Sequence, residues 1–209
     1  MQPVIDEFTH AIRLSAENRA PLLIRGGGSK DFYGNLGGAT GRTGESILET
    51  GVYSGTVDYE PTELVVTVRA GTRLADLERE LNGCHQMLSF EPPHFSSNTT
   101  IGGCVAAGLS GPRRASAGAV RDFVLGVRML DGKGKDLSFG GPVMKNVAGY
   151  DISRLLAGSM GTLGLLLEIS LKVMPMPARE LTLRMEMDEA EAIEKMDSWA
   201  RSEESGVRK

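Results

Sequence analysis

Two glycine-rich segments contain the residue types best suited to bind a large anionic ligand. The first, residues 25–31, reads Arg-Gly-Gly-Gly-Ser-Lys-Asp, and the second, residues 100–108, reads Thr-Ile-Gly-Gly-Cys-Val-Ala-Ala-Gly. Glycine has no Cβ, so consecutive backbone N–H groups can converge on a charged group and a flat ligand can approach the main chain. We call them the first and second glycine segments, and we expect both to be loops that face one ligand.

The first glycine segment combines backbone donors with positive charge. It offers successive N–H groups, the Ser29 hydroxyl and two cations, Arg25 and Lys30. Oriented amides and charge-assisted hydrogen bonds are what a pyrophosphate requires. A flexible surface turn explains the same three glycines equally well, so the neighbouring elements must decide between the two interpretations.

Other reactive side chains give weaker signals. His94 is a candidate general base, although an incidental loop histidine remains open as an alternative. Arg113 and Arg114 are candidates to neutralise a phosphate or to bind a substrate carboxylate, and a solvated pair remains equally open. The three histidines are scattered, so no metal site is expected. Cys84 and Cys104 have no CxxC spacing and are expected to be reduced thiols.

The composition restricts the class of protein. The chain has 209 residues, 41% hydrophobic and 24% charged, with a net charge of −4, which is ordinary for a globular protein and unlike a basic nucleic-acid binder. No apolar run is long enough to span a membrane, and the first residues do not resemble a signal peptide. A cytoplasmic location is therefore expected.

Hydrophobic periodicity predicts the elements that hold these segments. We expect a helix over residues 4–16, then a strand over 21–25 that leads into the first glycine segment, with 32–46 irregular. A helix capped by Thr72 should bury Leu74, Leu77 and Leu81. Further strands are expected at 52–57, 64–68, 120–130, 137–139 and 163–173, and beyond residue 177 a strand at 180–187 and a helix at 190–201.

The order of the motifs resembles the FAD-binding domain of the vanillyl-alcohol oxidase and p-cresol methylhydroxylase superfamily, over residues 5–177. The family often has Glu where this chain has Met160. The matching motifs are Arg-Gly-Gly-Gly-Ser at 25–29, Pro-x-x-Leu followed by Ala-Gly at 61–71, Thr-Ile-Gly-Gly at 100–103, Gly118, Gly-Tyr-Asp-Ile at 149–152 and Gly-Ser-Met-Gly-Thr-Leu-Gly at 158–164.

The resemblance implies an α+β fold with a PCMH-type FAD-binding domain at residues 1–177. Its two α/β subdomains would be a small one at about 1–83 and a larger, mostly antiparallel one at about 84–177, followed by an incomplete cap domain at 178–209. FAD would be non-covalent, because no histidine lies in the first glycine segment. The implied cofactor-binding residues are Arg25, Gly26, Gly27, Gly28, Ser29, Lys30, Asp31, Pro92, Thr100, Ile101, Gly102, Gly103, Gly108, Gly118 and Ile169.

Within the family, residues 91–95 and 108–114 are most similar to the FAD-binding subunits of glycolate oxidases. This implies oxidation of glycolate, or a related 2-hydroxy acid, beside a second flavoprotein subunit and an iron–sulfur subunit. Peripheral contact with the inner face of the membrane would come through those partners. A D-lactate dehydrogenase fragment and a scaffold that has lost FAD remain alternatives, and Gly102→Val is expected to abolish FAD binding while barely affecting the fold.

Overall fold

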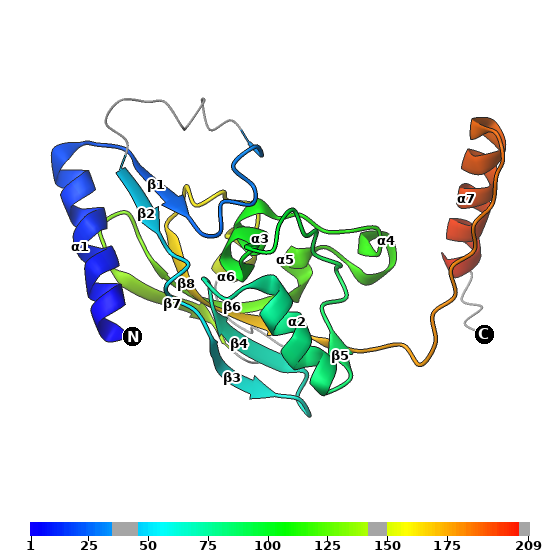
Figure 1. Cartoon of the computed structure of the whole chain (residues 1–209), viewed down its shortest axis with the longest axis horizontal. Coiled ribbons are helices and arrows are strands. Elements are labelled where there is room, and N and C mark those ends of the chain that lie inside the picture. Colours follow the sequence, from blue (N-terminus) through cyan, green and yellow to red (C-terminus); the bar gives the residue numbers. More distant parts are fainter. Residues whose placement is uncertain (35–45, 142–149, 205–209) are drawn as a thin grey trace. The chain divides into compact units, whose positions relative to one another are not determined.

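A computed structural model describes residues 1–34, 46–141 and 150–204 (Figure 1). Most of the irregular segment expected at 32–46, and Gly149 of the last but one motif, lie outside the described residues. The chain divides into two units, Met1–Met176 and Pro177–Lys209, and each is described by itself.

A five-stranded antiparallel sheet forms the centre of the first unit. Its central strand, β8, is almost entirely buried because it is an apolar run bounded by Gly164 and a later proline. Ile169 of β8 pairs with Val68 on one side and Val127 on the other. The strand order is β3 (Thr56–Glu60), β4 (Val65–Arg69), β8 (Leu165–Lys172), β6 (Val124–Leu130) and β7 (Asp136–Gly140).

A second, smaller layer contains α1 (Gln2–Asn18) and a two-stranded parallel sheet of β1 (Leu22–Arg25) and β2 (Ser46–Glu49). Ile5, Phe8 and Ile12 lie three and four residues apart, so they share one helical face and are buried. They pack in one cluster with residues from β2, β6 and β8. Figure 1 shows α1 beside β1 and β2.

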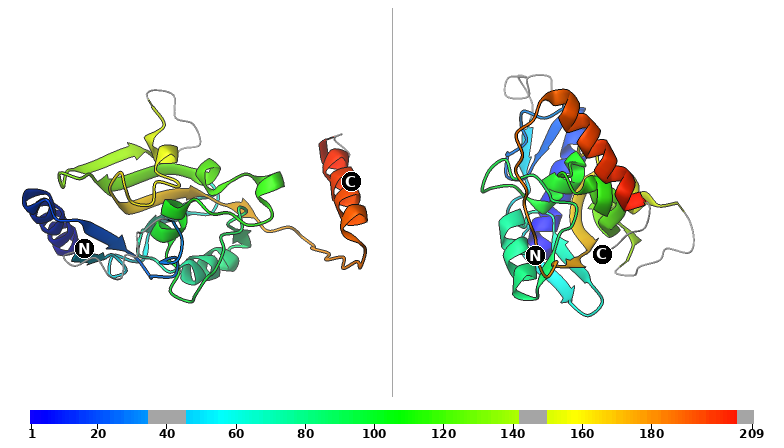
Figure 2. Two further views of the ribbon diagram at one scale, coloured as in Figure 1. Left: turned by 90° about the horizontal axis from the view of Figure 1, so that it is seen from above. Right: turned by 90° about the vertical axis from the view of Figure 1, so that its right-hand side faces the viewer.

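The main core lies between the five-stranded sheet and the helices α2 (Leu74–Gly83) and α3 (Ile101–Ala107). Figures 1 and 2 show both helices on one side of this sheet. The remaining short elements of the unit are α4 (Arg114–Ala117), α5 (Val120–Phe123), α6 (Ile152–Leu155) and the antiparallel pair β5 (Gln86–Met87) and β9 (Met174–Pro175).

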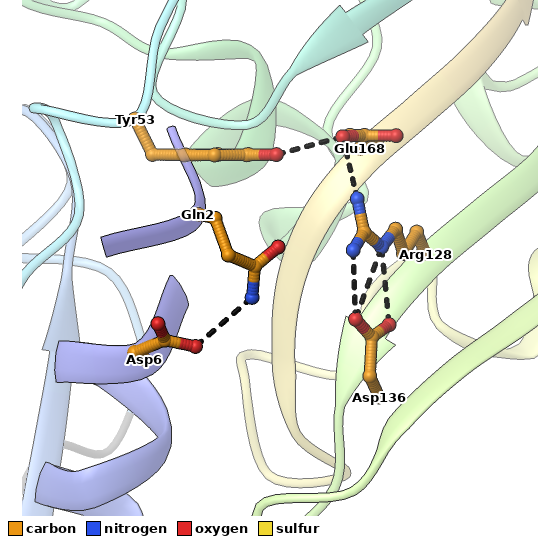
Figure 3. A network of polar contacts seen from close by, with 6 residues as sticks. All are labelled: Gln2, Asp6, Tyr53, Arg128, Asp136 and Glu168. Atoms are coloured by element: carbon orange, nitrogen blue, oxygen red, sulfur yellow. Dashed lines mark hydrogen bonds and ion pairs between the residues drawn. The ribbon is translucent and has the colours of Figure 1, made fainter. Parts of the chain in front are cut away.

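A polar network joins the layers (Figure 3). The buried Tyr53 hydroxyl donates to Glu168 Oε1 at 2.7 Å, and Arg128 Nη1 donates to the same oxygen at 3.0 Å. Arg128 Nη2 lies 2.8 Å from Asp136 Oδ2. Tyr53 thereby ties the turn after β2 to β8, β6 and β7.

Several local predictions from the sequence are wrong. The second glycine segment is the helix α3 and not a loop, and α2 is capped by Arg73, while Thr72 Oγ1 instead accepts from Gly55 N–H. The strand expected at 52–57 is shifted to β3, and the start of the strand expected at 120–130 is the helix α5. β2 was not expected at all.

The second unit contains α7 (Glu189–Glu204), as the periodicity at 190–201 predicts. The strand expected at 180–187 is absent, and these described residues form neither helix nor strand. Leu181 and Leu183 are 84% and 68% exposed. The strand was predicted only from the alternation of apolar and polar residues. Within the described chain no other strand pairs with this segment.

Candidate functional site

A cavity of about 320 Å³ lies where three separate segments meet. It is lined by the first glycine segment, by one side of α3 and by the turn that contains Gly161. Two further cavities, of about 310 and 80 Å³, also have Ile24 and Gly161 in their walls, so all three adjoin. The principal wall residues of the first cavity are Leu22, Leu23, Ile24, Gly26, Gly27, Gly28, Ser29, Lys30, Thr100, Gly103, Ala106, Ala107, Met160, Gly161 and Thr162.

Close backbone packing explains the glycines of the first segment. A Cβ on Gly26 would lie 2.5 Å from Thr100 Oγ1, and a Cβ on Gly27 would overlap the carbonyl oxygen of Asn98. The preceding carbonyl, of Arg25, accepts hydrogen bonds from the backbone N–H and the hydroxyl of Thr50 at 2.8 and 3.2 Å. The segment is therefore fixed from both sides and is not a free surface turn.

The two glycines at the start of α3 have different surroundings. Thr100 caps the helix, with its Oγ1 accepting from Gly103 N–H at 3.2 Å. Gly103 lines the main cavity, whereas Gly102 N–H donates to the carbonyl of Ala70 at 2.7 Å. A Cβ on Gly102 would lie 2.7 Å from the Ala70 Cβ, so protein fills the space on that side of Gly102, which also lines the adjoining cavity of about 80 Å³. The expectation that Gly102→Val would spare the fold is wrong.

The two cations of the first segment also differ. Arg25 Nη2 lies 2.6 Å from Asp31 Oδ2 and Nη1 lies 3.5 Å from Glu49 Oε1, and hydrogen bonding to Asp31 raises the pKa of Arg25. Lys30 Nζ is buried and has no hydrogen-bond partner among the described residues. It lies 5.6 Å from the centre of the Phe95 ring, and burial lowers its pKa.

Three other predicted residues lie away from this cavity. Pro92 lines a different cavity of about 700 Å³, together with Glu91 and Arg113. His94 Nε2 lies 2.9 Å from Glu78 Oε2. The weak catalytic candidates His94 and Arg114 are both exposed, and neither is in the wall of the main cavity.

The remaining predicted residues lie at helix ends or in the core, outside the walls of the three adjoining cavities. Gly108 ends α3 in the left-handed conformation with φ 68°, and Gly118 ends α4 with φ 103°. Ile101 and Ile169 are buried in the main core, and neither is in the wall of the three adjoining cavities. The structure therefore does not bring Ile101 or Ile169, both predicted to bind the cofactor, to these three cavities.

Residues 5–140 match the model of a protein family described as FAD binding domain. The chain belongs to this family. Because this match covers more than half of the 209 residues, the resemblance drawn from the motifs is confirmed, and FAD is the cofactor. The fold prediction, a PCMH-type domain with an antiparallel sheet, is also confirmed.

Sequence similarity to named proteins supports the assignment to this family. The chain is 48% identical over 198 residues to glycolate oxidase subunit GlcE of Escherichia coli (strain K12), covering 95% of this chain and 54% of that protein. It is 33% identical over 181 residues to glycolate oxidase subunit GlcD of Bacillus subtilis (strain 168), covering 85% and 37%. A D-lactate dehydrogenase of Anaerostipes hadrus is 29% identical, covering 85% and 36%. The chain thus spans between about a third and half of these relatives.

Solved structures support the fold. Alkyldihydroxyacetonephosphate synthase, in its P212121 crystal form, superimposes with a TM-score of 0.65 at 21% identity. The match covers 83% of this chain and 31% of that chain. At this identity the likeness establishes the architecture of the FAD binding domain and nothing further.

The cavity residues fit an FAD binding domain. The buried Lys30 ammonium, which has no partner in the part of the chain that the structure describes, is suited to bind an anion, and the glycine backbones beside it offer N–H donors to a phosphate. Three adjoining cavities suit an elongated ligand better than a compact one. Within the described residues, no group of three His, Cys, Asp or Glu could hold a metal ion. No helix in the described ranges is long and apolar enough to cross a membrane.

Some cavity residues were not among the predicted ones. Ala106 and Ala107 of α3, together with Met160, Gly161 and Thr162, line the main cavity. The signal for the last three was present, because they belong to the Gly-Ser-Met-Gly-Thr-Leu-Gly motif. The alanines carry no chemical signal, and only the helical geometry of α3 brings them to the cavity wall.

Proposed function

We propose that this FAD binding domain is part of an oxidoreductase that oxidises a 2-hydroxy acid, with glycolate as the substrate and glyoxylate as the product. The observation that carries the proposal is the cavity formed jointly by the first glycine segment, α3 and the 160–162 turn. The 48% identity to GlcE supports glycolate over other acids. Because the chain spans 54% of GlcE, the activity and substrate of that whole protein are proposals for this one.

FAD supplies the redox chemistry in such an enzyme, since it accepts two electrons from the substrate and passes them on. The residues of this chain have the simpler task of binding and orienting the cofactor. In the proposed arrangement, the N–H groups of Gly26–Lys30 bind the pyrophosphate, and Gly103 and Ala106 form a wall against which the remainder of FAD lies. In this arrangement FAD is bound non-covalently.

Substrate chemistry requires groups beyond this cavity. A 2-hydroxy acid needs a base for its hydroxyl proton and a cation for its carboxylate. No histidine from the described ranges lines the main cavity, and His94 is already paired with Glu78. We propose that these groups come from a cap domain and from partner subunits, a second flavoprotein and an iron–sulfur protein. A cytoplasmic location, with membrane contact only through the partners, belongs to the same proposal.

The visible absorption spectrum of the purified chain, after incubation with FAD and gel filtration, tests the cofactor part. The expected result is a flavin spectrum at about one FAD per chain. A colourless chain that cannot be reconstituted would favour a scaffold that has lost the cofactor.

Dye reduction by the assembled complex tests the substrate part. Glycolate should reduce the dye faster than D-lactate does, and the isolated chain should show little activity with either. The 29% identity to a D-lactate dehydrogenase supports D-lactate as the second candidate substrate. Preference of the complex for D-lactate would replace the glycolate proposal and leave FAD binding intact.

A further inference from the structure

Within the described residues, the first glycine segment has one neutralised cation and one unpaired cation. Arg25 contacts two carboxylates, those of Asp31 and Glu49. The Lys30 ammonium contacts no acceptor among the described residues, although its Nζ atom is buried. Both residues flank the same glycines, and only Lys30 is in the wall of the main cavity.

We propose that Lys30, and not Arg25, is the cation that neutralises the phosphate charge of FAD, and that the unpaired ammonium destabilises the protein when FAD is absent. This inference rests on the proposed position of FAD in the main cavity. It assigns different tasks to two residues that the sequence presents as equivalent. Arg25 holds the segment closed through Asp31, and Lys30 meets the ligand.

An unpaired, buried ammonium destabilises the folded protein. Removing a charge from water is unfavourable unless an opposite charge or hydrogen-bond acceptors replace the lost hydration. The Phe95 ring, 5.6 Å away, is one observed contact that offsets part of this cost. Phe95 is itself held edge-to-face by Phe32, with the ring centres 5.0 Å apart. A ring cannot accept three ammonium hydrogen bonds, so the site is incomplete without an anion.

The Cys104 thiol does not supply that anion. Cys104 interacts electrostatically with Lys30, but burial raises the pKa of the Cys104 thiol to about 12. The thiol is therefore neutral at physiological pH. Asp31 is the nearest carboxylate in sequence, and it is bound to Arg25 through two hydrogen bonds. A phosphate in the cavity would meet both Lys30 and the glycine N–H groups.

The test compares Lys30→Met with Lys133→Met, a matched change at an exposed lysine. Methionine keeps most of the apolar stem and removes the charge. In the apo-protein, Lys30→Met should raise Tm by about 2 °C or more, and Lys133→Met should leave it unchanged. In FAD titrations followed by flavin fluorescence, Lys30→Met should weaken affinity by about tenfold or more.

A second variant separates the two cations. The double change Arg25→Gln with Asp31→Asn removes that ion pair while keeping groups that can hydrogen bond. FAD affinity of this variant should keep the wild-type dependence on salt, whereas Lys30→Met should make affinity nearly independent of salt. The opposite pattern would assign the phosphate charge to Arg25 and overturn the inference.

The outcomes distinguish this inference from the proposed function. If Lys30→Met binds FAD like the wild type and has the same apo Tm, the inference is wrong although FAD binding stands. If the wild-type chain binds no FAD, the proposed cofactor site fails. The apo Tm then still tests the unpaired ammonium, because a Tm that does not rise in Lys30→Met contradicts it.

Discussion

Gly102 and Ala70 are in direct backbone contact: Gly102 N–H donates to the Ala70 carbonyl at 2.7 Å, and a Cβ on Gly102 would lie 2.7 Å from the Ala70 Cβ. This contact fixes the start of α3 on the turn that follows β4. It also shows that the two glycines of the Thr-Ile-Gly-Gly motif have different roles. One glycine allows the helix to approach the sheet, and its neighbour Gly103 leaves space for the cavity.

Gly102→Ala should therefore destabilise the fold by about 1–3 kcal/mol, because the added methyl group forces α3 away from Ala70. Chemical denaturation of the apo-protein measures this directly. Gly83→Ala is the matched control, since Gly83 is also helical and a Cβ there would meet no atom within 4 Å. Equal stability of the two variants would refute the close contact.

Tyr53→Phe should cost about 1–2 kcal/mol of folding free energy. The change keeps the ring edge-to-face with Phe8 but removes the hydroxyl that donates to Glu168 at 2.7 Å. Thermal unfolding compares it with Tyr150→Phe, at a side chain that is 92% exposed. We expect a lower Tm only for the Tyr53 variant, and the same Tm for both would show that the network in Figure 3 contributes nothing to stability.

The two cysteines should differ in reactivity. Cys84 is exposed, and Cys104 is 1% exposed with its pKa raised to about 12 by burial. A thiolate is the reactive form, so iodoacetamide should modify Cys84 alone in the folded protein at mildly alkaline pH. Mass spectrometry should find one added group in the folded chain and two after unfolding. Rapid modification of Cys104 in the folded chain would contradict its buried position.

Burial of the Lys30 ammonium should make the stability of the apo-protein depend on pH. Burial lowers the pKa of Lys30 from its ordinary value of 10.5, so the unfolded chain binds more protons than the folded one between these two pKa values. Stability attributable to Lys30 therefore rises with pH through this window. The stability advantage of Lys30→Met over the wild type should shrink between neutral pH and about pH 10. An advantage that stays constant would show that the charge is not its cause.

Periodicity predicted the elements that bury a continuous apolar face. Ile5, Phe8 and Ile12 mark α1, and Leu74, Leu77 and Leu81 mark α2, because each set is buried on one side of a helix. The continuous apolar run of β8 likewise predicts a buried strand, because β8 is covered on both faces. These patterns are local, so the sequence displays them directly.

The errors arise where tertiary contacts override local preference. Two glycines disfavour a helix at residues 100–108, yet Thr100 caps α3 and Ala70 accepts a hydrogen bond from its first turn. β2 has only four residues and one buried side chain, and its pairing with β1 is not visible in its own sequence. The sequence presents Arg25 and Lys30 as equivalent candidates to bind a phosphate. It cannot show that Arg25 contacts Glu49, because Glu49 lies on another strand.

We propose that FAD occupies the main cavity, and a titration of variants at two alanines tests this position. Ala106 lines the cavity, whereas Ala115 is exposed on α4 and is absent from its wall. Apo wild type, Ala106→Trp and Ala115→Trp are titrated with FAD while flavin fluorescence is followed, and circular dichroism confirms that each variant is folded. We predict one FAD per chain for the wild type and Ala115→Trp, and loss of binding for folded Ala106→Trp. Wild-type affinity in folded Ala106→Trp would show that the cofactor binds outside the main cavity.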